Sequence, residues 1–263
     1  MDKRALLDRF AADSDDRFLL SQVLDRMEAC RRRQSPECTV FLSPRERLAA
    51  EGMLKVADSG PWLAMGGYKE AERRCLLFLP DWLEPELVDQ GEYLAVLRCS
   101  WFKEDKLTHR DFLGALMGMG IQRDTVGDIL VGDGSCDLIV APTVAEFLKD
   151  SLDSAGRTKL RVERVEVSQV SVPTQERKIL RDTVAALRLD SVAAVGFSIS
   201  RSKASQLIAS GRCAVNWQET TKSDLSVRQG DVISCRGLGK CRLTEVGGLS
   251  RKGRINITME RYL

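Results

Sequence analysis

The chain has 263 residues, 43% of them apolar and 30% charged, and its net charge is only +2. This length allows two or three small domains, each with a modest core. No apolar run approaches the roughly 18 residues that a membrane-spanning helix needs, so we expect a soluble protein. The N-terminus lacks the apolar block of a secretory signal, which favours a cytoplasmic location.

The eight cysteines are dispersed along the chain, and most of them fall inside apolar runs. We expect them to be reduced core residues. The sequence has no CxxC pair and one histidine, His109, so we expect no metal site and no cofactor. General acid or base chemistry at His109 is an alternative, but a solvated residue in the first turn of a helix is favoured.

Charge is distributed unevenly along the chain. Residues 181–263 contain 14 Lys and Arg against 7 Asp and Glu, a net charge of +7. Residues 1–180 contain 26 against 31, a net charge of −5. A basic surplus confined to one segment indicates a nucleic-acid-binding surface there, because a merely soluble surface mixes the two signs.

Residues 1–70 are expected to form a helical region. Apolar residues recur at helical spacing over residues 6–10 and 18–27. The sequence SPRE from Ser43 predicts a third helix, because it combines an N-cap, a proline at the first helical position and a capping-box glutamate. Three arginines from Arg31 close the second helix, where cations complement the helix dipole; a dedicated RNA contact is the alternative.

Residues 71–170 are expected to form a second domain, in which strands alternate with helices. The expected strands are residues 75–80, 93–101, 126–131, 136–140 and 160–167, and the expected helices start near Thr108 and Thr143. From Tyr93 the order β-α-β-β-α-β is that of the ferredoxin-like arrangement, which RNA-recognition motifs share. The strand at 136–140 has no aromatic residue for base stacking, so RNA binding is not assigned to this domain.

A glycine-rich run, VGDGS at residues 131–135, separates two of these strands. Such a run can hold a nucleotide or S-adenosylmethionine when it opens a helix. Here a strand follows it, so no helix N-terminus is directed at a phosphate group. The run is therefore interpreted as a β-hairpin turn.

Residues 181–263 are expected to form a helical hairpin followed by a small β-sheet. A first helix covers residues 189–199, and Ser200 is the predicted N-cap of a second helix whose apolar residues recur at 204–208. Gly211 ends the second helix. The expected strands are residues 214–217, 232–235, 241–246 and 254–262. With the two preceding regions, this gives an α+β fold class.

The second helix of this hairpin has the chemistry of an anion site. Arg201 and Lys203 lie in its first turn, beside exposed N–H groups at the positive end of the helix dipole, and phosphate is the obvious anion. The predicted RNA-binding residues are Arg188, Ser200, Arg201, Ser202, Lys203, Gln206, Arg212, Asn216 and Lys222. A basic loop at residues 247–253 either contacts an RNA backbone or is simply solvated, and the sequence leaves both open.

The run SRSKASQLIASGRCAVN, residues 200–216, resembles the segment SRSKAxxLIxxGxVxVN of the S4-type RNA-binding domain, named after a small-subunit ribosomal protein. Cys213 stands where that domain usually has an aliphatic residue. The ordered run through the second helix and the following strand is a specific pattern. The resemblance implies that the C-terminal segment binds RNA.

Three further blocks, FLSPRE, HRDFLGALMGMGIQRDTVGDI and TVAALRLDSV, look like the YlmH family, so the resemblance covers nearly the full chain. It implies an N-terminal helical region, an RNA-recognition-like middle domain and a C-terminal S4-type domain. It also implies a noncatalytic RNA-binding protein, in some bacteria encoded near cell-division genes. Relatives act on the large ribosomal subunit in rescue and quality control of obstructed nascent chains, and contact ribosomal RNA and peptidyl-tRNA.

Two other classes of function are alternatives. S4-type domains also occur on pseudouridine synthases, tyrosyl-tRNA synthetases and RNA methyltransferases, but the sequence has no GRLD-like catalytic segment, no HIGH-like or KMSKS-like motif and no glycine loop that opens a helix. We therefore expect no catalytic residue and no enzyme. A scaffold linked to cell division would use the acidic residues 1–180. The expected partner is structured ribosomal or transfer RNA on the large subunit, without a membrane, and the chain is expected to be a monomer.

Overall fold

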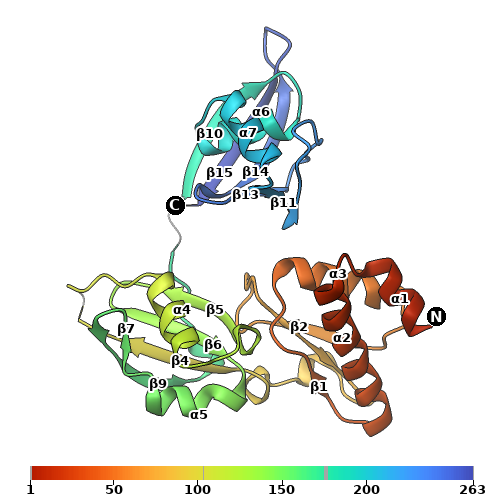
Figure 1. Cartoon of the computed structure of the whole chain (residues 1–263), viewed down its shortest axis with the longest axis vertical. Helices are drawn as coiled ribbons and strands as arrows, with labels where there is room; N and C mark the ends of the chain where they lie inside the picture. Colours follow the sequence, from red (N-terminus) through yellow and green to blue (C-terminus); the bar gives the residue numbers. More distant parts are fainter. Residues whose placement is uncertain (1, 103, 175–176, 263) are drawn as a thin grey trace. The chain divides into compact units, whose positions relative to one another are not determined.

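The computed structural model describes residues 2–102, 104–174 and 177–262. The chain divides into two compact units, Met1–Pro173 and Thr174–Leu263 (Figure 1). Both units combine helices with antiparallel sheets, which confirms the α+β fold class. Across the described ranges, no helix has the length and apolar character to cross a membrane.

The first unit begins with three helices, α1 (Lys3–Phe10), α2 (Ser14–Arg33) and α3 (Pro44–Leu54). Their apolar residues form one core with the neighbouring strands. The capping box predicted at the start of α3 is present, because the Ser43 side chain accepts from the Glu46 amide and the Glu46 carboxylate accepts from the Ser43 amide. Local sequence therefore sets where α3 begins.

A three-stranded antiparallel sheet, in the order β1-β3-β2, completes this half of the unit. Its strands are β1 (Glu37–Cys38), β2 (Trp62–Met65) and β3 (Cys75–Phe78). The region expected to be helical therefore also contains β1 and β2, which corrects the prediction made from the sequence. The expected boundary after residue 70 falls between β2 and β3, which pair with each other from Trp62–Phe78 to Met65–Cys75. The connection between β2 and β3 is nine residues long, so it carries none of the two-residue turn signals that reveal a hairpin in a sequence.

The other half of the first unit is the expected β-α-β-β-α-β arrangement. Its elements are β4 (Ala95–Ser100), α4 (His109–Gly118), β5 (Val126–Val131), β6 (Ser135–Val140), α5 (Pro142–Ser151) and β9 (Arg161–Val165). The strands follow the order β5-β6-β4-β9, and every pair is antiparallel. Residues of α4 and α5, such as Phe112 and Leu148, pack on one face of the sheet against Leu97 and Leu138. The ferredoxin-like prediction is confirmed.

Short elements connect this framework. Two strands, β7 (Ser154–Ala155) and β8 (Thr158–Lys159), pair with each other, and 3-10 helices lie at Pro85–Leu87, Gln90–Glu92, Arg123–Thr125 and Val167–Gln169. The VGDGS run forms the turn between β5 and β6, as expected, with Gly134 at φ 74°. No helix follows this turn directly, since β6 begins at Ser135.

On the sheet face opposite α4 and α5, the chain itself covers the two central strands, β6 and β4. Ile139 of β6 packs in one apolar cluster with Phe41, Met65 and Leu77 from the N-terminal half. Farther along the face, Arg98 donates to Asp137 at 2.8 Å from both Nε and Nη2. The Ser171 amide of the connecting segment also donates to Asp137 at 2.7 Å. An RNA-recognition motif uses this face to stack bases, and here protein occupies its two central strands.

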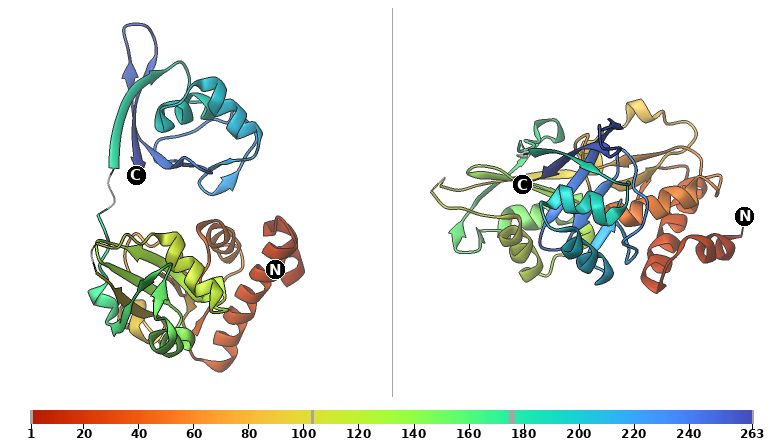
Figure 2. Two further views of the ribbon diagram at one scale, coloured as in Figure 1. Left: turned by 60° about the vertical axis from the view of Figure 1, so that its left-hand side comes forward. Right: turned by 90° about the horizontal axis from the view of Figure 1, so that it is seen from above.

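The second unit carries α6 (Leu189–Phe197) and α7 (Arg201–Ala209) on one face of an antiparallel sheet (Figures 1 and 2). The strands follow the order β10-β15-β14-β13-β11-β12. They are β10 (Arg177–Val184), β11 (Cys213–Val215), β12 (Gln218–Glu219), β13 (Val232–Cys235), β14 (Gly239–Leu249) and β15 (Ile255–Tyr262). The helical hairpin is confirmed. The strands expected after it are also present, but Asn216 and Trp217, expected to be in the first of them, form the turn after β11, both with positive φ. The hairpin β14–β15 is longer than expected, because β14 continues into the predicted loop.

The strand β10 was not expected, and the unit begins at Thr174, before the expected residue 181. All eight residues of β10 pair with β15, from Arg177–Tyr262 to Val184–Ile255. Val184 is buried, while most of the other β10 side chains are exposed and polar. An edge strand of this composition has no strong apolar alternation, so its sequence does not reveal that it is a strand.

Close packing between α6 and the sheet fixes the position of the helical hairpin. A Cβ atom placed on Gly196 of α6 would lie 2.5 Å from Cys241 Sγ and 3.0 Å from Met259 Cε. Only glycine allows the helix to approach β14 and β15 this closely. At the C-terminal end of α6, Arg261 Nη1 donates to the Phe197 carbonyl at 3.2 Å and links the helix to the sheet.

We predict that Gly196→Ala destabilises the second unit by about 1–2 kcal/mol, because the overpacking outweighs the gain in helix propensity. The matched control is Gly114→Ala on α4, where a Cβ would meet no atom within 4 Å. That variant should be neutral or stabilising by up to about 1 kcal/mol. Hydrogen exchange followed by mass spectrometry reports each unit separately. Unchanged exchange in α6 and β14 of Gly196→Ala would contradict the prediction.

Candidate nucleic-acid interface

The turn between α6 and α7 places the start of α7 at the surface. Ser198 ends α6 in the left-handed region, at φ 54°. Ser200 is the N-cap of α7, as predicted, and its hydroxyl accepts from the Lys203 amide at 3.2 Å. This hydroxyl is therefore engaged in capping, whereas Arg201, the first residue of α7, has an exposed side chain.

A buried carboxylate organises the arginines at this end of the hairpin. The Asp190 side chain is only 6% exposed and accepts from Arg201 Nε at 3.0 Å and Nη2 at 2.9 Å. Arg188 also donates to Asp190, with both contacts at 3.4 Å. Burial of Asp190 acts to raise its pKa, but the hydrogen bonds from Arg201, Arg188 and Ser191 outweigh it and hold the pKa below its usual value.

Arg201 keeps part of its binding capacity. The edge of the guanidinium formed by Nε and Nη2 faces Asp190, and the side chain is still 57% exposed. A guanidinium has five N–H donors. Nη1 has no hydrogen-bond partner among the residues that the structure describes. Asp190 therefore fixes the orientation of Arg201 while its outer edge remains open to an anion.

The loop that carries Lys222 is fastened to both helices. Its Ser223 carbonyl accepts from the Asp190 amide at 3.0 Å, and the Ser223 and Ser205 hydroxyls lie 3.0 Å apart. The Leu225 carbonyl accepts from the Leu189 amide at 2.8 Å. These contacts place exposed Lys222 next to the N-terminal end of α6, beside the cations of the helical hairpin.

Three more predicted residues lie on one exposed face of α7. Ser202, Lys203 and Gln206 are spaced so that residues three and four apart are neighbours on the helix surface. Within the described ranges, none of these side chains makes a hydrogen bond or an ion pair. They are therefore available to an external ligand. We call Arg188, Arg201, Ser202, Lys203, Gln206 and Lys222 the α7 surface.

Arg212 and Asn216 lie beyond the other end of α7, about 13 Å away along a nine-residue helix. Arg212 Nη2 donates to the Arg236 carbonyl at 2.8 Å. Asn216 donates to Asp231 at 2.8 Å and accepts from the Val232 amide at 2.9 Å, with φ 48° in a tight turn. The Asn216 amide thus stabilises the turn after β11, and the structure does not bring Arg212 or Asn216 together with the α7 surface.

The residues that position this surface were not predicted from the sequence. Three residues that we do not expect to contact RNA hold the proposed contact residues in place. Asp190 orients Arg201 and Arg188. The hydroxyl contact between Ser205 and Ser223 fastens the loop that carries Lys222. An acidic residue in the first turn of a helix is a weak indication by itself, since helix dipoles favour it everywhere. The burial of Asp190 and its distance to α7 follow only from the tertiary structure.

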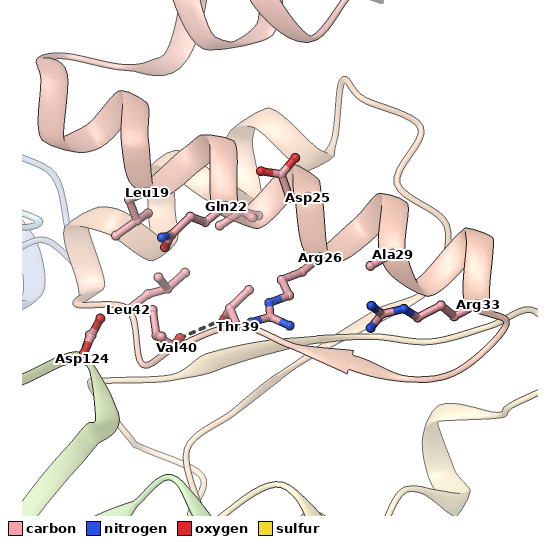
Figure 3. A pocket seen from close by; sticks show the side chains of 11 residues that line it. Leu19, Gln22, Asp25, Arg26, Ala29, Arg33, Thr39, Val40, Leu42 and Asp124 are labelled. Carbon is pink, nitrogen blue, oxygen red and sulfur yellow. Dashed lines mark hydrogen bonds between the residues drawn. The ribbon is translucent and has the colours of Figure 1, made fainter. Parts of the chain in front are cut away.

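A cavity of about 350 Å³ lies in the first unit, between α2 and residues 39–42 (Figure 3). Its polar wall includes Arg26 and Arg33 of α2. Both guanidinium groups donate to Glu37, at 3.1 Å and 2.6 Å. Because one carboxylate is shared between them, this cluster fastens α2 to β1, and the fold accounts for it without a ligand.

In residues 2–102, 104–174 and 177–262, no group of three or more His, Cys, Asp or Glu side chains is placed to hold a metal ion. His109 is the first residue of α4 and is exposed. Partial desolvation and the nearby Arg123 lower its pKa, so it is mostly neutral near pH 7.

Two known protein families match this chain, one in each of its two units. Residues 100–169 match the family described as "Putative RNA-binding domain in YlmH", and residues 187–233 match the "S4 domain". The S4 match contains α6, α7 and every residue of the α7 surface. The other match contains most of the ferredoxin-like sheet.

Similarity to individual proteins extends over nearly the whole chain. The chain is 33% identical over 247 residues to "Ribosome-associated protein quality control protein P2" of Bacillus subtilis (strain 168), which covers 94% of this chain and 95% of the relative. A solved structure, "Cell division protein ylmH from Streptococcus pneumoniae", has a TM-score of 0.50 and 20% identity, and the match covers 60% of this chain and 96% of that one. At that identity the likeness concerns the fold alone.

We predict that the ion pairs of Asp190 make the second unit sensitive to acid. The pKa of Asp190 is lower in the folded state, so its contribution is complete above the unfolded pKa of about 3.8 and is lost as pH falls through the folded pKa. Its partners are about half exposed, which limits the contribution to about 1 kcal/mol. Asp190→Asn should therefore weaken the pH dependence of stability between about pH 5 and 3.

The measurement is urea unfolding at several pH values, followed by NMR amide signals of α6 and α7. The matched control is Asp224→Asn in the loop after β12, where the side chain is exposed. Asp224→Asn should keep the acid dependence of the wild type. Equal pH dependence in Asp190→Asn and the wild type would show that the Asp190 pairs contribute nothing to stability.

Proposed function

The chain belongs to the YlmH family, and we propose that it binds structured ribosomal RNA or transfer RNA through the α7 surface of its second unit. It acts by binding and not by catalysing a reaction. The observation that carries this proposal is the arrangement at the start of α7. There a buried carboxylate orients Arg201, and Lys203 and Lys222 remain exposed.

The chemistry of the surface suits folded RNA. Its cations are directed at phosphate groups, and the neutral side chains of Ser202 and Gln206 can donate hydrogen bonds to the same backbone. Phosphate contacts position a protein but do not read bases, so we expect recognition of RNA shape and not of a sequence. Arg201 is suited to this role because its planar guanidinium presents paired donors to a phosphate.

The ribosome is the proposed location of this RNA, on its large subunit. Support comes from the S4 match over the α7 surface and from the relative whose name places it in ribosome-associated quality control. We infer a role in the rescue or quality control of stalled translation, and a cytoplasmic location follows from it. We also propose that the chain acts as a monomer.

A protein contact through the first unit is a second candidate function. Residues 75–97 contain five acidic residues and no Lys or Arg, so this stretch repels RNA. The same stretch exposes two large apolar side chains, Trp82 at 65% and Leu87 at 71%. If this chain acts as a scaffold, a basic protein partner with an apolar contact surface would suit this stretch. Binding that survives ribonuclease treatment would favour this second candidate.

We predict that Lys203→Glu/Lys222→Glu weakens RNA binding strongly. Four or five phosphate contacts give a slope of log K against log salt of about −3 to −4, and loss of two contacts makes the slope shallower by about 1.4. These two lysines are preferable to Arg201, since Arg201→Glu would also place a second carboxylate beside buried Asp190. Binding to large-subunit ribosomal RNA is measured at several salt concentrations by filter retention.

The control is Lys55→Glu/Lys69→Glu in the first unit, which makes the same change in net charge at two exposed lysines. This control should bind nearly as the wild type does. Sedimentation of each variant with ribosomal fractions tests the proposed location. If Lys203→Glu/Lys222→Glu binds RNA and co-sediments as well as the control, the α7 surface is not the RNA-binding surface.

A further inference from the structure

We propose that the tip of the β14–β15 hairpin is a second RNA-contacting element, separate from the α7 surface, that binds a phosphate backbone. The basic tip consists of residues 249–253, including Leu249, Arg251 and Lys252. This inference rests on the proposed function, because it assigns a further part of the same unit to the same class of ligand. The sequence left open whether this loop contacts an RNA backbone or is simply solvated, and the inference favours contact.

The tip projects from the body of the second unit. β14 pairs with β13 only from Gly239 to Arg242, whereas it pairs with β15 as far as Leu249. The distal part of β14 therefore has a strand neighbour on one side only, and the hairpin extends past α6 and α7 (Figures 1 and 2). β15 keeps β10 as its other neighbour as far as Val184–Ile255, so the part that lies beyond the sheet is the turn at residues 250–254. A projecting turn can enter a groove or a cleft of folded RNA that a flat surface cannot reach.

Hydrogen bonds hold the projecting turn in one conformation. The Ser250 amide donates to the Arg254 carbonyl at 2.7 Å, and the Gly253 amide donates to the Ser250 carbonyl at 2.9 Å. Ser250 Oγ accepts from the Arg254 amide at 3.1 Å, and Asn256 Nδ2 donates to the Gly248 carbonyl at 2.6 Å. An ordered turn loses little conformational entropy on binding, so its cations are preorganised.

The cations of this segment divide into an anchor and a free pair. Residues 247–254 contain three cations and no acidic residue. Arg254 Nε donates to Thr183 Oγ1 of β10 at 2.9 Å and fixes the base of the tip. Arg251 and Lys252 are exposed and have no ion pair or hydrogen bond to any described residue. Two unpaired cations at the end of a fixed projection form an electrostatic contact for a polyanion.

Leu249 distinguishes this tip from an ordinary solvated turn. Its side chain is 71% exposed and contributes nothing to the core of the unit. Beside two cations, an apolar side chain can pack on a ribose or a base face while the cations contact phosphates. One exposed leucine is a small apolar area for insertion into a lipid bilayer, which usually takes a broad apolar face, so the observations favour RNA over an anionic membrane.

The tip lies outside the S4 match, which ends at residue 233. The S4 domain therefore supplies the α7 surface, and the extension β14–β15 supplies the second contact. Both belong to one compact unit, so binding at one site raises the effective concentration of RNA at the other. Two separated backbone contacts on one rigid body select for the shape of a folded RNA.

The test uses the full chain and purified large-subunit ribosomal RNA. Arg251→Glu/Lys252→Glu is compared with the wild type, with Lys203→Glu/Lys222→Glu and with the control Lys55→Glu/Lys69→Glu. Loss of two backbone contacts should raise Kd about tenfold at physiological salt and make the salt slope shallower by about 1.4. Hydroxyl-radical footprinting should show that the tip variant loses protection of one set of nucleotides and the α7 variant loses another.

The outcomes separate this inference from the proposed function. If the tip variant binds and protects RNA as the control does while the α7 variant is impaired, the tip proposal is wrong and the proposed function stands. If only the tip variant is impaired, the α7 surface is wrong and the tip stands. If neither is impaired, both fail.

Two further measurements distinguish lost contacts from added repulsion, and RNA from a lipid surface. The neutral variant Arg251→Gln/Lys252→Gln removes the cations without adding repulsion, and it should still weaken binding several-fold while its NMR spectrum outside the tip stays that of the wild type.

Vesicles of phosphatidylglycerol and phosphatidylcholine test whether the tip binds a membrane instead. If the tip variants lose vesicle binding and keep full affinity for ribosomal RNA, the ligand is a membrane surface and the proposal is overturned.

Discussion

The ion pairs of Asp190 are the interaction on which the proposed RNA-binding surface depends. A carboxylate that is almost fully buried is stable only when charged partners compensate for its desolvation. Here Arg201 and Arg188 provide that compensation from the first residue of α7 and the N-cap of α6. Since the Asp190 amide also donates to the Ser223 carbonyl, one residue sets the positions of both helix ends and of the loop that carries Lys222.

Some basic residues of the second unit build the fold, and others are left for a ligand. Arg201, Arg254 and Arg261 donate to a carboxylate, a hydroxyl or carbonyl groups of the protein. Lys203, Arg251 and Lys252 are exposed and unpaired within the described ranges. Arginine has rigid, directional donors that suit both fixed protein contacts and phosphates, whereas lysine is a mobile point charge. The net charge alone does not reveal this division.

Local sequence determines much of this structure, but contacts between distant residues determine the parts that were missed. The capping box at Ser43, the N-cap at Ser200 and the β-α-β-β-α-β order were predicted because their determinants lie within a few residues of one another. β10 was not predicted, because its partner β15 lies far along the chain. The pairing of β2 with β3 was not predicted either, because their nine-residue connection has no two-residue turn signal. In the same way, the type and spacing of residues were enough to propose Arg201 as a site residue, whereas the engagement of Asn216 by Asp231 required the tertiary structure.

The first unit shows why a fold by itself does not assign an RNA-binding surface. Its ferredoxin-like sheet has the strand order of an RNA-recognition motif and matches a family described as RNA-binding. Over β6 and β4, the face that such motifs use is nevertheless covered by the cluster around Ile139 and by the Arg98–Asp137 pair, whose carboxylate is buried. A polyanion could reach the sheet there only by displacing this core, at the cost of exposing apolar side chains and an ion pair. Base stacking on these two central strands is therefore blocked, and an RNA contact of this domain would use its helices, its loops or the edge strand β9, whose outer side chains are exposed.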